Sequence, residues 1–437
     1  MEVAMEIKRD VYLDRLIVRK HNGLIKVITG IRRSGKSYLL NTLFYRHLIA
    51  ENISEDHIIK FAFDSAEDLL KIGEDPIVLD NEKEDRKVDP SKFINWLMPQ
   101  IKGGDMYYLL LDEVQKLGAF ESVLNGFLRR ENLDVYVTGS NSKFLSKDIL
   151  TEFRGRGDEV HVLPLSFSEY YAFKQGDKSE AYDDYSVYGG LPAVALMATE
   201  EQKTNYLISQ MQNLYLRDIV NRYSVQDETA LGEVIDVIAS GISTLTNPKK
   251  IANTMNTIHG TKTCAATVDR YIGYAEEAFI LTRVKRYNVK GRKYIGTPYK
   301  IYFEDVGLRN VRLSFRQIEG THMMENIIYN ELRYRGYQVD VGTVESREKD
   351  PSGKEIRVQR EIDFIASLGS KKYYIQSAYA IPDQEKYEQE TKSFEHTMDS
   401  FKKIIIIEKS MKPRYDEHGY LMMGVKEFLL DANSLLI

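Results

Sequence analysis

Residues 30–37 read GIRRSGKS and place two glycines, a lysine and a serine at a spacing that suits phosphate binding. Gly30 and Gly35 let the backbone turn tightly, so that successive N–H groups point at phosphate oxygens. Lys36 is expected to reach the β- and γ-phosphates, and the Ser37 hydroxyl to ligate Mg²⁺. The pattern predicts a site for ATP or ADP formed by Gly30, Ile31, Arg32, Arg33, Ser34, Gly35, Lys36, Ser37 and Tyr38.

Two adjacent acids supply a second set of reactive side chains. Asp112 and Glu113 end the apolar run YYLLLDE (107–113), and its lack of alternation predicts a strand buried on both faces. At the strand end, Asp112 is expected to hold Mg²⁺, directly or through water. Glu113 is expected to act as general base on the attacking water. With the phosphate loop, these acids predict ATP hydrolysis with Mg²⁺ as cofactor.

Polar and basic residues after two further strands are candidates for contacts with the γ-phosphate. DVYVTGSNS (134–142) ends in small polar residues at the same predicted sheet edge, and Ser140 or Asn141 is expected to contact the γ-phosphate or align the water. An arginine is also expected to neutralise charge that develops on the transferred phosphoryl group. The candidates are Arg154 and Arg156, with Arg32 and Arg33 in the phosphate loop as alternatives.

These side chains need a sheet to position them, and strand and helix patterns alternate from about residue 24 to 166. This alternation is typical of an open, mostly parallel α/β sheet. The helix expected after Ser37 would direct its N-terminus, with a partial positive charge, at the phosphates. The segment 66–105 carries acids and few apolar residues and is expected to be a surface insertion. The predicted strands are KVITG, IIKFAFD, YYLLLDE, DVYVTG and VHVLPLS.

The pattern becomes helical after residue 166, and residues 167–227 are expected to form a helical lid on the ATPase core of residues 1–166. Residues 228–318 read as three helical segments followed by two strands around a basic turn, which describes a winged-helix module. Bases on the third helix and the hairpin are expected to contact double-stranded DNA. The candidates are Lys262, Thr267 and Arg270 on the helix, and Lys290, Arg292 and Lys293 on the hairpin.

A further α/β unit is expected over residues 319–437. Glu325, Asp363 and Gln376 have the types and order of oxygen ligands in a metal-dependent nuclease. Such a site also needs a lysine two residues after the last ligand, and Ala378 stands there instead. We therefore expect a degenerate nuclease site without cleavage activity.

Composition narrows the class of protein. The chain has 437 residues and a net charge of −5, which argues against a protein that coats nucleic acid generally. Eleven bases against three acids lie between Thr246 and Lys300, which favours one local polyanion contact. A single cysteine, Cys264, excludes internal disulfides. With no apolar run of about 20 residues and no signal peptide, we expect a cytoplasmic location and no membrane contact.

Together, these motifs resemble the AAA-type ATPases of bacteria and archaea that carry a winged helix and a C-terminal restriction-endonuclease-like domain. The resemblance spans nearly the whole chain through GIRRSGKS, YLLLDEVQ, VTGSNSKFLS, FRGRGDEV, YGGLPAV, LYLRDIV, YFEDVGLRN and REIDF. It implies an AAA-like sheet, Mg²⁺-dependent ATP binding and hydrolysis, and association into oligomers. It also assigns the sensor role to Ser140 or Asn141 and matches the arginine pair to the family's RGR segment.

Three functions compete at this point. The first is an ATPase that couples nucleotide state to its C-terminal modules, on DNA or on a protein partner. The second is an ATP-regulated DNA nuclease. The third is a scaffold that binds ATP without hydrolysing it, although Glu113 argues against this because a pure binder needs no acid that activates water.

Overall fold

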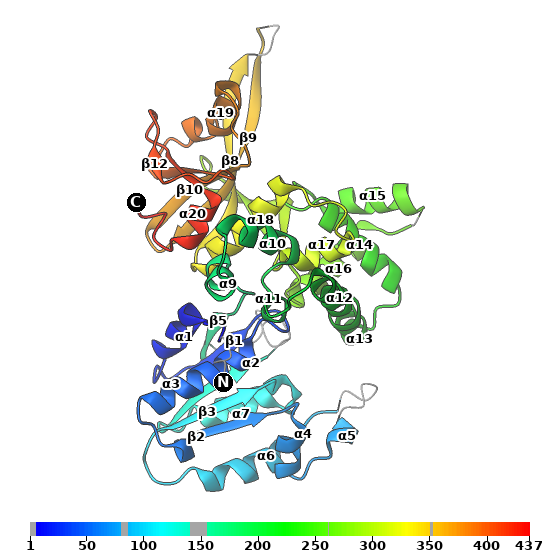
Figure 1. The fold of residues 1–437 in the computed structure, drawn as a ribbon. Helices are drawn as coiled ribbons and strands as arrows, with labels where there is room; N and C mark the ends of the chain where they lie inside the picture. The colour runs from blue at the N-terminus through cyan, green and yellow to red at the C-terminus, as the bar shows by residue number, and fades with distance from the viewer. Residues whose placement is uncertain (1–5, 80–85, 140–154, 261, 350–352) are drawn as a thin grey trace. The chain divides into compact units, whose positions relative to one another are not determined.

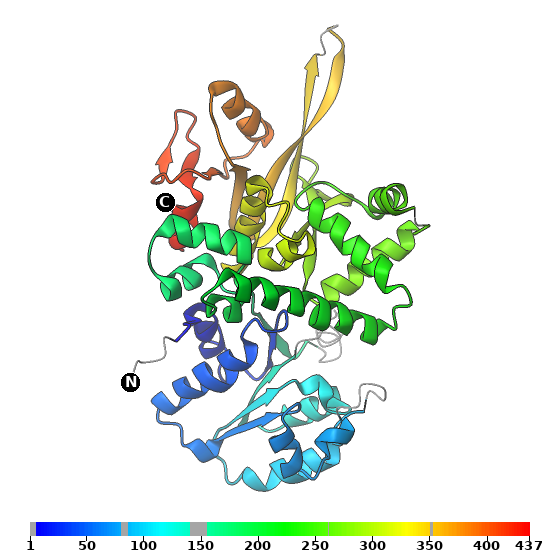
Figure 2. The ribbon, with the colours of Figure 1, turned by 45° about the vertical axis from the view of Figure 1, so that its right-hand side comes forward.

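The computed structural model describes residues 6–79, 86–139, 155–260, 262–349 and 353–437. The chain divides into two compact units (Figures 1 and 2). The first unit contains residues 1–163 and 277–279, and the second contains residues 164–276 and 280–437. Each described unit contains its own β-sheet, of five strands in the first and eight in the second.

The sheet of the first unit is parallel throughout, as the sequence predicts, with the strand order β2-β3-β4-β1-β5. Every residue of β1, β3 and β4 is buried, because helices cover both faces. The strand β1, which leads into the phosphate loop, lies between β4 and β5. The strands are β1 (Ile25–Thr29), β2 (Ile58–Ala62), β3 (Tyr107–Asp112), β4 (Leu133–Thr138) and β5 (Gly157–His161).

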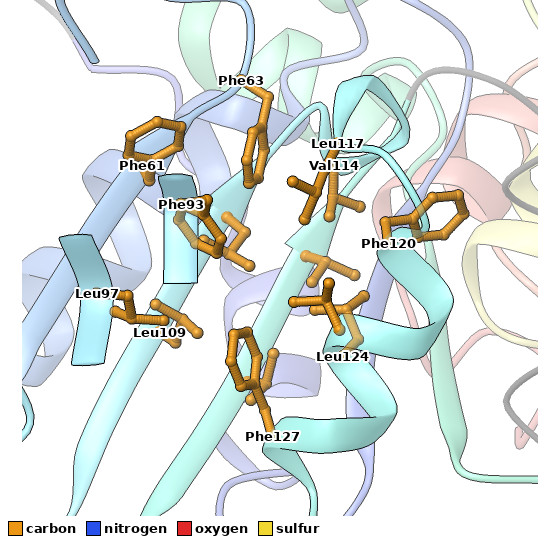
Figure 3. Packing of buried hydrophobic residues seen from close by; sticks show 14 of the residues in the cluster. Phe61, Phe63, Phe93, Leu97, Leu109, Val114, Leu117, Phe120, Leu124 and Phe127 are labelled. Carbon is orange, nitrogen blue, oxygen red and sulfur yellow. The ribbon is translucent and has the colours of Figure 1, made fainter. Parts of the chain in front are cut away.

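One face of this sheet packs against α6 (Pro90–Leu97) and α7 (Phe120–Phe127), as Figure 3 shows. Successive side chains of a strand point to opposite faces, so alternate residues of each strand enter this core. Aromatic rings lie among its aliphatic side chains, with the Phe61 and Phe93 ring centroids 5.0 Å apart. The strands contribute Ile25, Val27, Ile59, Phe61, Tyr107, Leu109, Leu111, Leu133, Val135 and Val137.

The segment 66–105 corrects one expectation. It folds as α4 (Ala66–Lys71), α5 (Pro76–Leu79) and α6, followed by the short helix η3 (Met98–Gln100). Phe93 and Leu97 are fully buried in the core described above, so the segment is not simply a surface insertion. Leu69, Ile72 and Val88 of the segment are buried in the same core, and the Asp89 carboxylate caps the first turn of α6.

The other face of the sheet packs on helices that flank the phosphate loop. They are α1 (Asp10–Ile17), α2 (Lys36–Tyr38), η1 (Leu39–Phe44) and α3 (Tyr45–Ala50), and the last three form one continuous helical segment. Phe44 is fully buried, with its ring 4.5 Å from that of Tyr136. On this face Lys26 of β1 forms a buried ion pair with Asp134 of β4.

The second unit begins with helices that the sequence analysis assigned to a lid. A capping box formed by Ser166 and Glu169 starts the first of them. The structure groups them with residues 280–437 rather than with the first sheet. They are α9 (Phe167–Lys174), α10 (Lys178–Tyr188), α11 (Pro192–Ala195), α12 (Glu200–Ser209), η6 (Gln210–Leu216) and α13 (Arg217–Tyr223).

Three helices and a hairpin follow, in the order the sequence predicts. The helices are α14 (Glu228–Ser240), α15 (Pro248–His259) and α16 (Ala265–Glu277), and the strands are β6 (Leu281–Asn288) and β7 (Lys293–Phe303). Asn247 caps α15, with Pro248 in its first turn, as expected. The hairpin does not stand alone, because β6 pairs with β8 in the large sheet.

That sheet has the order β12-β13-β11-β10-β9-β8-β6-β7 and mixes parallel and antiparallel pairs. The strands β8 and β9 form a long antiparallel ribbon, seen in Figure 2. The remaining strands are β8 (Gln338–Lys349), β9 (Glu355–Leu368), β10 (Lys371–Ala378), β11 (Lys402–Ile407), β12 (Arg414–Tyr415) and β13 (Leu421–Gly424). The helices are α17 (Val306–Arg312), α18 (Gly320–Tyr334), α19 (Gln384–Thr391) and α20 (Val425–Leu430).

Two further observations bear on the sequence analysis. Among the described residues, no helix is both long enough and apolar enough to cross a membrane. Cys264 is a free, exposed thiol.

Candidate active site

The phosphate loop connects β1 to the helical segment that begins at Lys36. Gly30 and Gly35 have φ angles of 133° and 94°, a region that L side chains rarely adopt. A Cβ atom on Gly30 would lie 2.1 Å from the Val162 carbonyl oxygen, so only glycine fits there. Both glycines therefore shape the loop, as the sequence predicts. They adopt a backbone conformation that disfavours other residues, and Gly30 also lies against the chain after β5.

Lys36 lies over its own loop and is buried. Its ammonium group donates hydrogen bonds to the carbonyl oxygens of Gly30 and Ile31, both at 2.9 Å. The hydroxyl of Ser34, in the same loop, is fully buried and has no hydrogen-bond partner among the described residues. An unsatisfied buried hydroxyl is costly, so a phosphate oxygen is a fitting partner for it. The loop therefore combines a cation and a spare donor suited to a polyphosphate.

Arg9 fixes the loop from outside the motif, and the sequence analysis did not identify it. Its guanidinium donates to the Ser34 carbonyl at 2.9 Å and to the Leu163 carbonyl at 2.6 Å. It also lies over the Tyr12 ring, 4.7 Å from the centroid. The Tyr12 hydroxyl in turn accepts a bond from the Leu163 N–H. Arg9 thus ties the loop to the end of β5, and only its position in the fold reveals this role.

Asp112 occupies the end of β3, beside the helix that follows the loop. Its carboxylate accepts hydrogen bonds from the Asn41 amide at 3.1 Å and from the hydroxyls of Thr138 and Ser37. Burial raises the pKa of Asp112, although the two hydroxyl bonds oppose that shift. The two predicted Mg²⁺ ligands, Ser37 and Asp112, are therefore in direct contact.

Glu113 lies next to Asp112 in a left-handed backbone conformation with a φ angle of 50°. A residue with a large side chain pays for such a conformation, and these residues cluster at functional sites. The Glu113 N–H donates to the Thr138 hydroxyl at 3.1 Å, and that hydroxyl donates to Asp112. The Gln115 amide donates to the Glu113 carboxylate. Thr138, which the sequence analysis passed over, thus positions both acids.

Asp64 is a third acid at this sheet edge, and the sequence analysis missed it too. It follows β2, whose last residue pairs with Asp112. Desolvation and the nearby charges of Glu113 and Asp112 raise the pKa of Asp64. An acid after a predicted strand, in FAFDS, was the available signal. In the arrangement seen here, and within the part of the chain that is described, no group of three or more His, Cys, Asp or Glu side chains is placed to hold a metal ion.

The sequence analysis also named two small polar residues and an arginine pair as possible contacts with the γ-phosphate. Ser140, Asn141 and Arg154 lie outside the described residues. Arg156 immediately precedes β5, and its carbonyl accepts a bond from the Ile25 N–H at the start of β1. The parallel strands β1 and β5 therefore place Arg156 at the sheet edge opposite the phosphate loop. An action of Arg156 on a nucleotide bound to its own chain does not fit this position, and an action on a neighbouring subunit stays a prediction.

The residues predicted to contact DNA lie in the second unit. Arg270 is exposed and Thr267 half-buried on α16, whereas the exposed Lys262 precedes that helix, which corrects its expected position. Lys290 and Arg292 lie in the exposed turn between β6 and β7, and the exposed Lys293 begins β7.

The predicted nuclease residues lie close together, although a lysine stands between two of them. Glu325 of α18 and Asp363 of β9 contact the same lysine, Lys300 of β7. Gln376 precedes Ser377, whose N–H donates to Asp363 at 2.9 Å, and the Gln376 amide donates to Glu390 of α19 at 3.1 Å. A role for Gln376 as a metal ligand stays a prediction.

Two family models match this chain, and an uncharacterized bacterial protein is similar to nearly all of it. A family model described as an AAA domain matches residues 22–171, and one described as a domain of unknown function, DUF8612, matches residues 179–319. An uncharacterized protein of Haemophilus influenzae is 34% identical over 416 residues, which cover 94% of this chain and 95% of that protein. The chain belongs to the same family as that protein. Its first unit contains an AAA-type P-loop ATPase domain, the class of domain that binds ATP.

More distant similarities extend beyond this family. An uncharacterized protein of Methanocaldococcus jannaschii is 27% identical over 98% of this chain and 90% of its own length. Among solved structures, a Walker-type ATPase of Pyrococcus abyssi has 15% identity and a TM-score of 0.49, covering 70% of this chain and 96% of that one. The Aeropyrum pernix ORC1 protein, solved in complex with DNA, has 11% identity and a TM-score of 0.27, with 71% and 93% coverage. At these scores the solved structures add nothing to the AAA-domain assignment.

Two of the motifs that carried the resemblance contact each other in the second unit. Asp305 of YFEDVGLRN is buried, and its carboxylate accepts bonds from the N–H groups of Gly190 and Leu308, at 2.7 and 3.1 Å. A Cβ atom on Gly189 would lie 2.2 Å from that carboxylate, so YGGLPAV requires its glycine there. The Asn310 amide donates to the carbonyls of Ser186 and Val187. These two motifs lie outside the AAA domain. They therefore have a structural role, because their hydrogen bonds join α10 to α17.

Proposed function

We propose that this protein hydrolyses ATP with Mg²⁺ and uses the nucleotide state to control its second unit. The observation that carries the proposal is the arrangement around Thr138. One hydroxyl binds both the Asp112 carboxylate and the Glu113 backbone, and Ser37 binds the same carboxylate. This arrangement fixes a metal ligand and a general base with respect to each other, as a phosphoryl-transfer site needs.

The residues present fit Mg²⁺ held with a nucleotide. Magnesium is usually bound by one or two protein oxygens, several waters and the substrate phosphates, and Ser37 and Asp112 supply two adjacent oxygens. When bound, the ion would neutralise charge on the β- and γ-phosphates.

The chain's own residues then divide the remaining work. Lys36 exchanges its bonds with the loop carbonyls for bonds to the phosphates, and the loop N–H groups hold the phosphate oxygens. Glu113 takes a proton from the attacking water, and the bond from Gln115 orients its carboxylate. The helices α9–α13, assigned to a lid by the sequence analysis, are the proposed link to the rest of the second unit.

Replacement of Lys36 by alanine tests the phosphate site directly. We expect steady-state ATP hydrolysis to fall by at least about 100-fold, because the variant loses the cation that contacts the transferred phosphoryl group. Lys60→Ala is a matched control, since Lys60 is an exposed lysine on β2 of the same sheet, and it should retain the wild-type rate. Tight ATP binding without hydrolysis in the wild type would replace the ATPase with a nucleotide-binding scaffold.

A contact with double-stranded DNA is the second candidate function, favoured by the exposed basic turn of the β6–β7 hairpin. In a winged helix such a turn contacts phosphates while the third helix, here α16, enters the major groove. The local charge supports this role, since eleven bases against three acids lie between Thr246 and Lys300.

The triple variant Lys290→Ala/Arg292→Ala/Lys293→Ala tests the DNA contact. We expect weaker binding to a DNA duplex and a salt dependence whose log–log slope is reduced by roughly 2–3, because each lost phosphate contact removes about 0.9. Fluorescence anisotropy at several salt concentrations measures both quantities. The matched control Lys409→Ala/Lys412→Ala/Arg414→Ala removes the same charge from another exposed loop and should change neither. Equal losses in both triples would exclude the hairpin as the specific contact.

A further inference from the structure

Lys300 lies at the centre of a buried cluster of acids in the second unit. Only 3% of its side chain is exposed. The ammonium nitrogen lies 2.8 Å from Glu325, 2.6 Å from Glu361 and 3.1 Å from Asp363. The Tyr302 hydroxyl donates to Glu325 at 2.6 Å, and the Ser377 N–H donates to Asp363 at 2.9 Å. Each acid therefore has at least one partner, and the lysine is shared by all three.

The charges in this cluster depend on one another. Burial raises the pKa of Glu325 to about 7 and also raises that of Glu361. Burial alone would lower the pKa of Lys300, but the three acids and Tyr302 outweigh it and hold that pKa well above its usual value. The lysine therefore stays charged, as a buried cation among acids must.

The position of Lys300 also depends on how the sheet curls. The strands β6 and β8 separate β7 from β9 in the sheet order, and three strand spacings in a flat sheet amount to roughly 14 Å. Lys300 nevertheless reaches Glu361 and Asp363 of β9 directly. The sheet must therefore curl around α18, which supplies Glu325, and the ammonium joins the two strands and the helix.

A restriction-endonuclease-like fold implies a divalent cation held by such acids, and the residues here do not fit one. Metal ligation would need the oxygens of Glu325 and Asp363 to turn to an ion at about 2.0–2.6 Å, whereas both contact a lysine. The amide nitrogen of Gln376, the third expected ligand, donates to Glu390. Two of the acids are also almost fully buried, with the side chains of Glu325 and Asp363 only 9% and 10% exposed, whereas that of Glu361 is 30% exposed. A DNA phosphate therefore has no access to Glu325 and Asp363 in this arrangement.

We propose that the Lys300 ammonium permanently occupies the position that a divalent cation would take between Glu325, Glu361 and Asp363, so that the second unit is closed to catalytic metal. Two consequences follow. The wild-type protein does not bind a divalent cation in this cluster, and removal of the ammonium converts the cluster into a site that does.

Manganese binding to the full-length protein without nucleotide tests both consequences. Electron paramagnetic resonance measures the number of Mn²⁺ ions bound per chain. The proteins compared are the wild type, Lys300→Ala and Lys300→Ala/Asp363→Asn. Each is made in an Asp112→Asn background, to remove the metal ligand of the AAA domain. We expect the single Lys300→Ala change to add one bound Mn²⁺ per chain, and Asp363→Asn to abolish it. The wild-type cluster should bind none.

Thermal unfolding gives an independent readout. Without metal, Lys300→Ala should lower the Tm by roughly 5–15 °C, because the buried Glu325 and Asp363 and the partly exposed Glu361 lose their cation. Millimolar Mn²⁺ should restore part of that loss in Lys300→Ala but leave the wild-type Tm unchanged, because only the variant has a site for the ion. A conservative variant, Lys300→Arg, keeps the charge and should bind no Mn²⁺.

Two outcomes would overturn the proposal. One is a Mn²⁺ ion in the wild type that Asp363→Asn or Glu325→Gln removes. The other is a folded Lys300→Ala protein, verified by circular dichroism, that binds no additional Mn²⁺. If Lys300→Ala does not fold, the Mn²⁺ titration of the wild type decides. The proposal is supported if the wild-type cluster binds no Mn²⁺ and a chelator leaves the wild-type Tm unchanged.

Discussion

Glu113→Gln should abolish ATP turnover while ATP binding stays close to that of the wild type. The substitution keeps the size of the side chain and one oxygen that can accept from Gln115, and it removes the negative charge and the ability to accept a proton from water. Loss of a general base typically costs about 10²–10⁴-fold in rate, and none of that loss should appear in the affinity for ATP. Single-turnover hydrolysis and titration with a fluorescent ATP analogue measure the two quantities separately.

The structure offers a matched control for this experiment in Asp64. This acid lies at the same sheet edge, and the neighbouring charges of Asp112 and Glu113 help to raise its pKa. The Thr138 hydroxyl accepts a bond from the Glu113 N–H and donates to Asp112, the predicted Mg²⁺ ligand. This link to the predicted ligand distinguishes Glu113 from Asp64. Asp64→Asn should therefore lower turnover far less than Glu113→Gln does. The reverse order, with Glu113→Gln active and Asp64→Asn inactive, would make Asp64 the base.

Lys26→Met should be the most destabilising of the single substitutions considered in the first unit, costing about 3–5 kcal/mol in the free energy of unfolding. Lys26 is fully buried in β1, where its ammonium pairs with Asp134 of β4. Methionine fills a similar volume, but it leaves the Asp134 carboxylate buried with only the His21 N–H at 3.1 Å and the Tyr136 hydroxyl at 2.9 Å as partners. An unpaired buried charge is far more costly than a missing surface contact.

Two comparison variants separate the charge effect from simple loss of a lysine. Lys60→Met removes an exposed lysine from β2 that lies 3.7 Å from the Tyr45 ring centre, and it should cost no more than about 1 kcal/mol. Lys26→Met/Asp134→Asn removes both charges while keeping an acceptor for His21 and Tyr136, so it should recover much of the stability. Chemical denaturation measures all three. A double variant no more stable than Lys26→Met would show that packing around Lys26, rather than the charge on Asp134, sets the loss.

The sequence predicted the first sheet well because its signals are local. A phosphate loop needs glycines at fixed positions, and a strand covered on both faces needs an unbroken apolar run, so GIRRSGKS and YYLLLD could be assigned without tertiary information. The strand expected in VHVLPLS begins earlier, as β5 at Gly157, and ends at His161. Its pairing with β1 sets those limits, and a window of sequence does not contain that pairing.

The parts of the site that could not be predicted depend on contacts between distant residues. Arg9 is an ordinary basic residue until the fold places it against Ser34 and Leu163. Thr138 reads as part of a strand, although its hydroxyl donates to the Asp112 carboxylate and accepts from the Glu113 N–H. The same limit explains the missed lysine of the acid cluster, because Lys300 is distant in sequence from Asp363 and no spacing rule links them.

The interior position of β1, between β4 and β5, also has a consequence for how the first unit folds. This strand is made first, yet its partners β4 and β5 are made last, with Val27 opposite Val137 and Glu159. Until they are available, β1 lacks both of its hydrogen-bonding neighbours, and Lys26 lacks the acid that stabilises it in the interior. Contacts this far apart in sequence slow folding. The nucleotide loop is therefore expected to be among the last elements to order during synthesis, and chains that end before residue 133 should be prone to aggregation.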